Sequence, residues 1–268
     1  VQGSDVIQPW AIAEIRRRLP ACLVTHWMGD CRLQIPPDLA EICKATHATL
    51  ISSIGQIPMF QKAGARRVHY VQIGLDWAED VLGLPAWEPP FRVPDVVFCG
   101  GHYDHVADFK QGTRARIATI SALSRAGVDV GVVGRGWPAQ IPVVGECHVK
   151  QQHHVYRRAK VALSINHFND IDRYYSDRHL IAMASGTPVV ALKVPGMELE
   201  FTDQRDCLFA TTEGGIVASV KWLLDNPVTA ARIGRTGRDE VRREHTWTAR
   251  IRELVKADLP DGAFAALA

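Results

Sequence analysis

A pair of glycines with basic side chains after it is the first feature that points to chemistry. Gly100 and Gly101 follow the apolar run at 95–99, where a strand would end and a helix would begin. Glycines at such a turn let backbone N–H groups approach a phosphate, and the N-terminus of the helix adds partial positive charge. The side chains that follow and suit an anion site are His102, Lys110, Arg114 and Arg116. We therefore predict a phosphate site here, with a plain surface turn as the alternative.

This turn does not match the common nucleotide motifs. It lacks both G-x-G-x-x-G and the G-K-[S/T] of a P-loop, so neither a dinucleotide site nor a nucleotide hydrolase is indicated. The same loop offers possible metal ligands, namely His102, Asp104, His105 and Asp108. Such a cluster within one loop is more often solvated, so we expect no bound metal.

A second group of polar residues lies in the segment 176–210. Helical spacing of apolar residues ends at Gly186, and Pro188 prevents continuation, so a short helix is followed by a buried strand at 187–192. Ligands of open parallel sheets bind beyond the carboxyl ends of the strands. This rule places Gly196, Glu198 and the helix start, with Arg178, near a ligand.

His26 and Asp30 form a third candidate pair, at the end of the apolar strand predicted over 21–27. At the carboxyl end of a strand they would bind an acceptor or make a catalytic contact. The alternative is structural, with the histidine closing a turn and the aspartate capping the next segment.

The elements that position these residues alternate between strand and helix along the whole chain. Strands are expected at 6–8, 21–27, 49–52, 68–72, 95–99, 128–133, 160–165 and 187–192, and helices at 10–19, 36–44, 56–63, 114–126, 216–224 and from Pro227 onward. Four prolines in the segment 84–94 interrupt the pattern and mark a domain boundary. The fold class is therefore α/β, with two Rossmann-like domains and parallel sheets.

Spaced motifs in the second half resemble the donor-binding half of GT-B glycosyltransferases, in particular the group that includes spore-maturation-type proteins. The matching residues are R178-H-L-I-A-M-A-S-G-T-P-V-V190, then Glu198, Phe201 and Asp206, and finally H245-T-W-T-A-R250. The resemblance implies a GT-B-like fold with an acceptor-side domain at 1–90, short or truncated, and a nucleotide-sugar domain at 91–250. The segment 251–268 would form a closing helix and tail that packs back on the first domain.

The resemblance also implies further site residues and exposes one departure. A similar G-x-G-W turn lies near the nucleotide in the family, which makes Gly134 and Arg135 candidates for base or phosphate contact, although a tight turn with Trp137 in the core is equally compatible. The loop 166–175 would carry Arg173 toward the sugar. Many retaining GT-B enzymes hold the donor with two glutamates eight positions apart, and Arg173 and Ile181 stand at those positions.

Composition indicates an ordinary globular protein. Of the 268 residues, 47% are hydrophobic and 22% charged, and the net charge of +2 gives no electrostatic case for nucleic acid. No apolar run is long enough to span a membrane, and the six cysteines lack a C-x-x-C pair, so we expect a cytoplasmic protein with reduced thiols.

The sequence thus predicts a glycosyltransferase that moves a sugar from a nucleotide-diphosphate sugar, its substrate rather than a cofactor, to a hydroxyl acceptor. Retention of configuration and independence of metal are implied by the resemblance alone. Because both usual carboxylates are missing, a non-catalytic binding or scaffold protein is the alternative, and a nucleotide-sugar epimerase is a third. The base, the sugar, the acceptor and the oligomeric state are not determined by the sequence.

Overall fold

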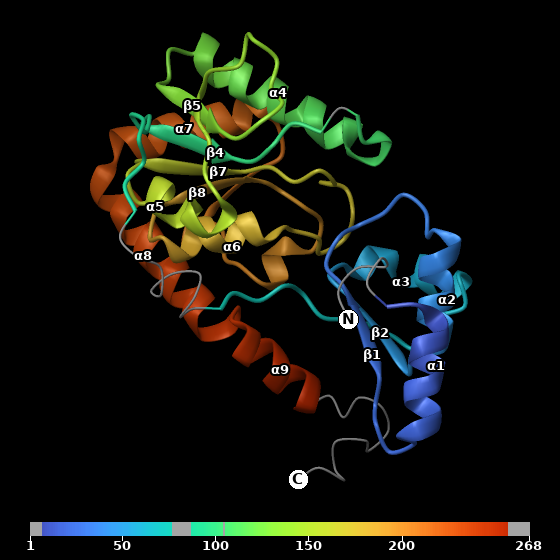
Figure 1. Cartoon of the computed structure of the whole chain (residues 1–268). Helices are drawn as coiled ribbons and strands as arrows, with labels where there is room; N and C mark the ends of the chain where they lie inside the picture. The colour runs from blue at the N-terminus through green and yellow to red at the C-terminus, as the bar shows by residue number, and fades with distance from the viewer. Residues whose placement is uncertain (1–6, 77–86, 104, 257–268) are drawn as a thin grey trace.

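The computed structural model describes residues 7–76, 87–103 and 105–256 and contains two parallel sheets that lie beside each other (Figure 1). The first sheet has three strands in the order β1-β2-β3, and the second has six in the order β6-β5-β4-β7-β8-β9. The strands are β1 Thr25–Met28, β2 Ala48–Ile51, β3 Val68–Tyr70, β4 Val96–Cys99, β5 Val130–Val133, β6 Val143–Gly145, β7 Val161–Ser164, β8 Val189–Leu192 and β9 Leu208–Ala210. The helices are α1 Pro9–Arg18, α2 Pro37–Ala45, α3 Ile57–Lys62, α4 Lys110–Arg125, α5 Gln152–Tyr156, α6 Asp177–Ala184, α7 Glu213–Asp225, α8 Pro227–Glu244 and α9 Trp247–Lys256.

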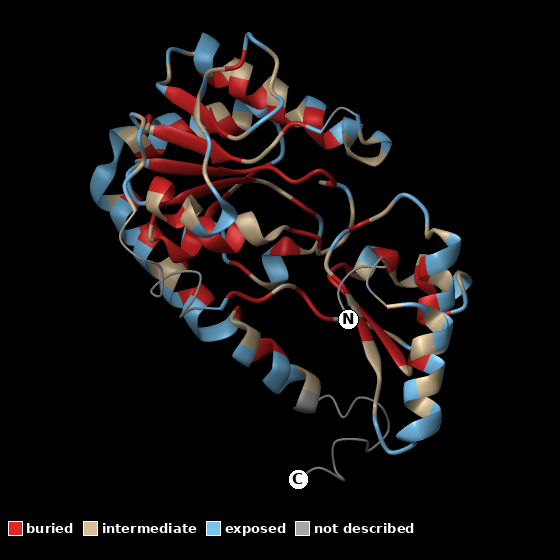
Figure 2. Ribbon diagram, in the orientation of Figure 1, coloured by how far each residue is buried: buried red, intermediate tan, exposed pale blue. Residues whose placement is uncertain are grey.

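The six-stranded sheet is covered on both faces, which is why its strands read as continuous apolar runs. Every residue of β4, β5 and β7 is buried (Figure 2). Alternate residues of each strand enter different clusters: Phe98 packs with Ile120 of α4 and Ile216 of α7, whereas Val97 packs with Val155 of α5 and Leu180 of α6. The sheet therefore forms the middle layer of three.

The three-stranded sheet is packed in the same way on a smaller scale. Met28 and Ile51 face Leu39 of α2 and Phe60 of α3. On the other face, Leu50 and Val71 pack with Leu254 of α9, the last helix of the chain. The first and last thirds of the sequence thus share one core.

The chain returns to the first sheet through the segment between α8 and α9. Leu75 and Thr246 form a parallel β-bridge, and the rings of Trp27 and Trp247 meet edge to face at a centroid distance of 5.1 Å. Gly74 allows this approach, because a Cβ there would lie 2.6 Å from the backbone nitrogen of Trp247.

Some expected elements differ from the structure. Ile7 and Gln8 are not in a strand, and Val6 lies outside the described residues. Strand β1 starts at Thr25 rather than at residue 21, because its partner β2 begins at Ala48, which pairs with Thr25. The short strands β6 and β9 were not expected, since three residues are too few to show an alternation. Helix α4 starts four residues early, and part of the predicted boundary segment, 77–86, lies outside the described residues.

Candidate active site

A pocket of about 1000 Å³ opens where β4 and β5 end and α6 begins. From β4 the chain adds β5 and β6 on one side of the sheet and then β7, β8 and β9 on the other. Open α/β sheets bind their ligands at such a change of direction, beyond the carboxyl ends of the strands. Of the predicted donor site, the residues that line this pocket are Gly100, Gly101, His102, Gly134, Arg135 and Arg178. The fold therefore brings together about half of the set that the sequence singled out.

The two glycine turns at the ends of β4 and β5 interlock. A Cβ on Gly134 would lie 2.2 Å from the carbonyl oxygen of Gly100, and one on Gly136, whose φ is +80°, would lie 2.7 Å from that of His102. The indole of Trp137 donates a hydrogen bond to the Gly100 oxygen at 2.8 Å. Glycine is thus required at positions 134 and 136 because the two turns are in contact. The hydrogen bond from Trp137 to Gly100 holds the turns together.

Two backbone N–H groups of this turn are used within the protein. The N–H of Gly100 donates to Val133 O and that of His102 donates to Arg135 O, each at 2.9 Å. These two groups cannot bind a phosphate without breaking those bonds, and the phosphate site at this turn stays a prediction.

Arg178, in the first turn of α6, is the basic residue that the sequence placed at this site and the structure puts in the pocket wall. Its Nη1 lies 3.1 Å from where a Cβ of Gly100 would be, and its guanidinium lies 5.9 Å from the centre of the Phe98 ring. No carboxylate among the described residues lies within ion-pair distance of it.

Arg116 lies behind the same turn and is completely buried. It donates from Nε to Ile165 O at 3.0 Å and from Nη1 to Gly101 O at 3.3 Å, and Nη1 lies 2.7 Å from Nε2 of His167. Its Nη2 has no partner among the described residues, and no described carboxylate pairs with it. Burial, and then the charge of Arg178, lowers the pKa of this guanidinium. A buried cation without a counterion is costly. Arg116 lies behind the pocket wall and is not among the residues that line the pocket.

The sequence contained a signal for Arg116. It shares helical spacing with Ile120 and Leu123, the buried face of α4, whereas Lys110 and Arg114 point outward and are exposed. Of the three basic residues predicted on this helix, the structure thus turns Arg116 inward, toward Gly101, and Lys110 and Arg114 outward.

Other predicted donor residues lie away from the pocket. Glu198 is exposed and pairs with Lys193 at 3.4 Å. Gly196 has a φ of +75° and leaves room for the side chains of Asp172 and Arg173. Arg135, in contrast, lines the pocket and pairs with Glu146.

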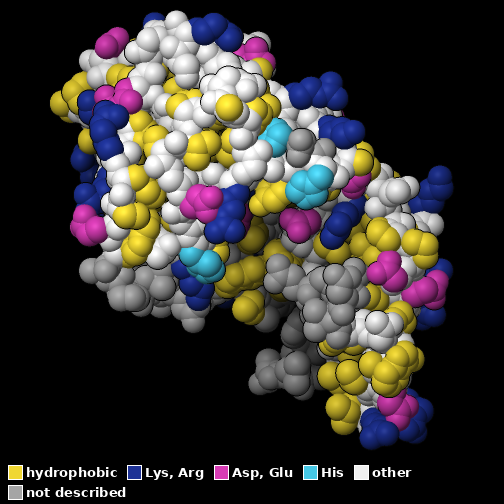
Figure 3. Space-filling model, turned by 45° about the horizontal axis from the view of Figure 1, so that its top comes forward, with side chains coloured by type: hydrophobic (Ala, Val, Ile, Leu, Met, Phe, Trp, Pro, Cys, Tyr) yellow, Lys and Arg dark blue, Asp and Glu magenta, His cyan; other side chains and the backbone are white. Residues whose placement is uncertain are grey.

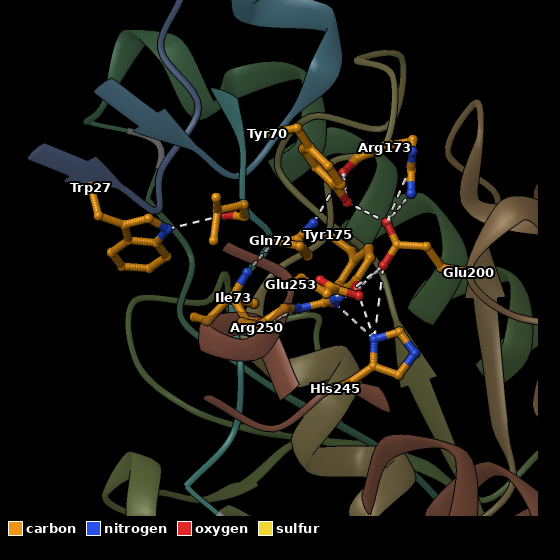
Figure 4. A network of polar contacts seen from close by, with 11 residues as sticks. Trp27, Tyr70, Gln72, Ile73, Arg173, Tyr175, Glu200, His245, Arg250 and Glu253 are labelled. Carbon is orange, nitrogen blue, oxygen red and sulfur yellow. Dashed lines mark hydrogen bonds and ion pairs between the residues drawn. The ribbon is translucent and has the colours of Figure 1, made fainter. Parts of the chain in front are cut away.

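Arg173 belongs to a polar network around Glu200 that joins the two sheets (Figure 4). Glu200 accepts hydrogen bonds from Tyr70 of β3, from Tyr175 at 2.6 Å, from Arg173 at 3.2 Å and from Arg250 of α9 at 3.2 Å. The glutamate and Arg250 side chains are each 6% exposed. This network holds the junction between the sheets and is not part of the pocket wall.

The two predicted catalytic residues lie apart from the pocket. His26 shares the helix-covered face of β1 with Met28 and is completely buried, and neither ring nitrogen has a hydrogen-bond partner among the described residues. Burial lowers its pKa to about 4. Asp30 is exposed, and its charge acts on Cys31 and on Tyr174 in the loop between β7 and α6. Of the pair, only Asp30 is exposed.

The structure adds pocket residues that the sequence did not assign to the donor. Tyr103 and His105 lie in the loop after Gly101, and Asp177 precedes Arg178. The others follow the short strand β6, which was not predicted, and are Glu146, Cys147, His148, Val149, Gln151 and Gln152. Within the described ranges no three His, Cys, Asp or Glu residues are grouped for a metal, and no helix there is long and apolar enough to cross a membrane. Figure 3 shows Lys and Arg side chains interleaved with Asp and Glu on one face, with histidines near its middle.

Comparison with solved structures shows the same fold in several glycosyltransferases. Anabaena HepE, solved with UDP and glucose, has a TM-score of 0.63 at 11% identity over 93% of this chain and 75% of HepE. A glycosyltransferase from Rickettsia africae has a TM-score of 0.61 at 10% identity over 93% and 79% of the two chains. Sucrose-phosphate synthase from Thermosynechococcus elongatus has a TM-score of 0.55 at 19% identity. The match covers 85% of this chain but only 61% of the synthase.

These likenesses confirm the GT-B-like α/β fold expected from the sequence. A search of curated proteins found no match. The profile of the family described as "Glycosyl transferase-like" matches residues 114–256, from α4 through Arg178 and Glu200 to α9. Because this match covers more than half of the sequence, the chain belongs to that glycosyltransferase family.

Proposed function

We propose that this protein transfers a sugar from a nucleotide-diphosphate sugar to a hydroxyl acceptor. The observation that carries the proposal is the pair Arg116 and Arg178, two cations without a described carboxylate partner at the end of β4. Negative charge builds up on the diphosphate as the glycosidic bond breaks, and preorganised cations stabilise it. A diphosphate would supply the anion that these two side chains lack.

The shape of the pocket supports a nucleotide. Its volume of about 1000 Å³ lies at the upper end of ordinary ligand pockets and far exceeds a diphosphate. Besides Arg178, the wall includes Val149 and Gln152 from the segment after β6, and Tyr103 and His105 from the loop after β4. We propose that the first group of residues contacts the nucleoside and the second the sugar. HepE, which has the same fold, was solved with UDP and glucose.

The acceptor would bind on the side of the three-stranded sheet. Asp30, exposed at the end of β1, is the residue that we propose to contact the acceptor hydroxyl. The resemblance to retaining enzymes supports retention of configuration, and we propose that transfer needs no divalent metal. Addition of EDTA should leave transfer unchanged, and NMR of the first product should show the anomer of the donor.

The non-catalytic alternative rests on the departure from the family pattern at the loop after β7. The loop after β7 packs against the first sheet through Cys31, Phe168 and Tyr174, and Arg173 is engaged by Glu200. Arg173, which the resemblance would carry toward the sugar, is thus held by Glu200 instead. A binding protein that keeps the diphosphate site without turnover would look the same.

Thermal unfolding with UDP, GDP, ADP, dTDP and CMP separates these possibilities. A ligand at one hundred times its dissociation constant adds about 2.7 kcal/mol of stability, which appears as a shift of a few degrees. We expect one diphosphate to stabilise the protein selectively, and Arg178→Ala to remove the shift without unfolding the chain. Turnover of the matching nucleotide sugar then distinguishes the enzyme from the binding protein. Absence of any shift would overturn the proposed site.

A further inference from the structure

We propose that Cys147 is a thiol-modification site in the wall of the pocket, where it reacts with small disulfides and is then resolved by Cys99 to an intramolecular disulfide. The inference does not depend on the proposed function. Cys147 lines the pocket and is partly buried, whereas Cys99, the last residue of β4, is completely buried. All six cysteines of the chain are free thiols in the structure.

The six-stranded sheet brings these two thiols together from distant parts of the chain. Cys99 pairs with Val133 in the register between β4 and β5, and Val133 pairs with Gly145 of β6. Cys147 follows Gly145 by two residues and packs against the hydrophobic cluster that contains Cys99. The side chains of the two cysteines are hydrogen-bonded to each other. The two sulfur atoms are therefore neighbours before any reaction takes place.

The hydrogen bond between the thiols gives them different roles. It lowers the pKa of Cys147, whereas burial and then the same bond raise the pKa of Cys99. Cys147 is thus the thiol that loses its proton first, and the S–H of Cys99 donates to the resulting thiolate. The thiolate is the nucleophile in thiol–disulfide exchange. Of the two sulfur atoms, that of Cys147 is also the one that a reagent in the pocket can reach.

The reaction consists of two exchanges with a small aliphatic disulfide, RSSR. In the first, the thiolate of Cys147 attacks one sulfur of the reagent, the S–S bond of the reagent breaks, and RS⁻ takes up a proton and leaves as RSH. In the second, Cys99 gives up its proton and attacks the sulfur of Cys147, which expels the remaining RS⁻ as RSH. The two cysteines lose two electrons and two protons, and the reagent is reduced to two molecules of RSH.

The product would change the wall of the pocket. A bond from Cys99 to Cys147 ties the segment after β6 to the end of β4, and both ends of that link adjoin the pocket. The charge of Arg178, which also lines the pocket, acts on Cys99. The pocket would therefore have a reduced form and an oxidised form, and a dithiol would convert the second into the first.

The test treats the full chain with hydroxyethyl disulfide, a small uncharged reagent, and locates the products by intact-mass and peptide mass spectrometry. The wild type is compared with Cys147→Ser, with Cys99→Ala and with the control Cys22→Ser, which removes an exposed thiol between α1 and β1. Circular dichroism checks that each variant is folded. Because Cys99 is in the core, the wild type and Cys147→Ser decide the result if Cys99→Ala does not fold.

We expect the wild type to end with a disulfide between Cys99 and Cys147 and with the reagent retained only on Cys22. Cys22→Ser should form the same disulfide and retain no reagent, whereas Cys147→Ser should lose the disulfide. In Cys99→Ala the reagent should stay on Cys147, because no neighbouring thiol displaces it. Dithiothreitol should restore both thiols of the wild type. A wild type in which Cys147 stays unmodified while Cys22 reacts, or in which Cys147 retains the reagent, overturns the assignment.

Discussion

Arg116 and Arg178 lie against the same aromatic ring, with their guanidinium carbons 5.2 and 5.9 Å from the centre of Phe98. Arg116 comes from α4 and Arg178 from α6, and the ring belongs to β4, the strand at which the strand order reverses. Cation–π contact offsets part of the repulsion between the two charges. The arrangement stores an unfavourable electrostatic interaction that a bound dianion would relieve.

Removal of the buried guanidinium should therefore separate binding from stability. We expect Arg116→Met to abolish stabilisation by the nucleotide diphosphate, while the free energy of unfolding of the ligand-free protein changes by no more than about 1 kcal/mol, because lost hydrogen bonds are offset by removal of a buried unpaired charge. Urea unfolding with and without ligand measures both quantities. The control, Arg114→Met, changes an exposed residue of the same helix and should keep the ligand response. A large loss of stability with an intact response would show that Arg116 is only structural.

The contact between the glycine turns is tested by Gly134→Ala. The added Cβ would meet the Gly100 oxygen at 2.2 Å, so the turn must move. We expect a loss of about 1–3 kcal/mol in stability and a weaker ligand response, because Arg178 lies against Gly100. Gly214→Ala in α7, where no atom lies within 4 Å of the new Cβ, should be neutral or slightly stabilising. Equal stability of the two variants would contradict the interlocked turns.

The network around Glu200 predicts that a conservative substitution of this residue lowers the free energy of unfolding strongly. Glu200→Gln keeps the shape but leaves Arg173 and Arg250 without their buried counterion, so we expect a loss of about 3–5 kcal/mol in the free energy of unfolding. Glu198→Gln, which removes an exposed pair with Lys193, should cost less than about 1 kcal/mol. Chemical denaturation of both variants gives the comparison. Similar losses would mean that the network does not hold the sheets together.

His26 predicts acid sensitivity of the first sheet. Burial lowers its folded-state pKa to about 4, whereas an unfolded histidine titrates near about 6.5. Between these values the unfolded state binds the extra proton, so stability is complete above pH ~6.5 and falls as the pH drops. From pH 7 to pH 5 the wild type should lose about 2 kcal/mol more than His26→Leu. Parallel acid profiles of the two proteins would show that His26 does not contribute.

Much of the fold was accessible from the sequence, because the strands of a parallel sheet covered on both faces must be apolar throughout. The runs at Val96–Cys99, Val130–Val133 and Val161–Ser164 follow that rule, and the glycines after the first two mark where the turns touch. The family profile confirms the recognition that rested on the residues between Arg178 and Arg250. The short strands β6 and β9 were not predicted, because they are strands through pairing with their neighbours and not through a local sequence pattern.

The site was harder to predict from the sequence, because packing between distant segments determines which residues form it. Arg114 and Arg116 are equivalent as residue types, yet Arg116 reaches the site because α4 turns its face toward Gly101 and Ile165. Glu200 meets Tyr70 across 130 positions of sequence, which no local spacing reveals. The sequence by itself determined the alternating elements, the glycine turn and the family. The tertiary structure decided which charges are buried without partners, because burial and counterions depend on how the two sheets and the closing helix pack.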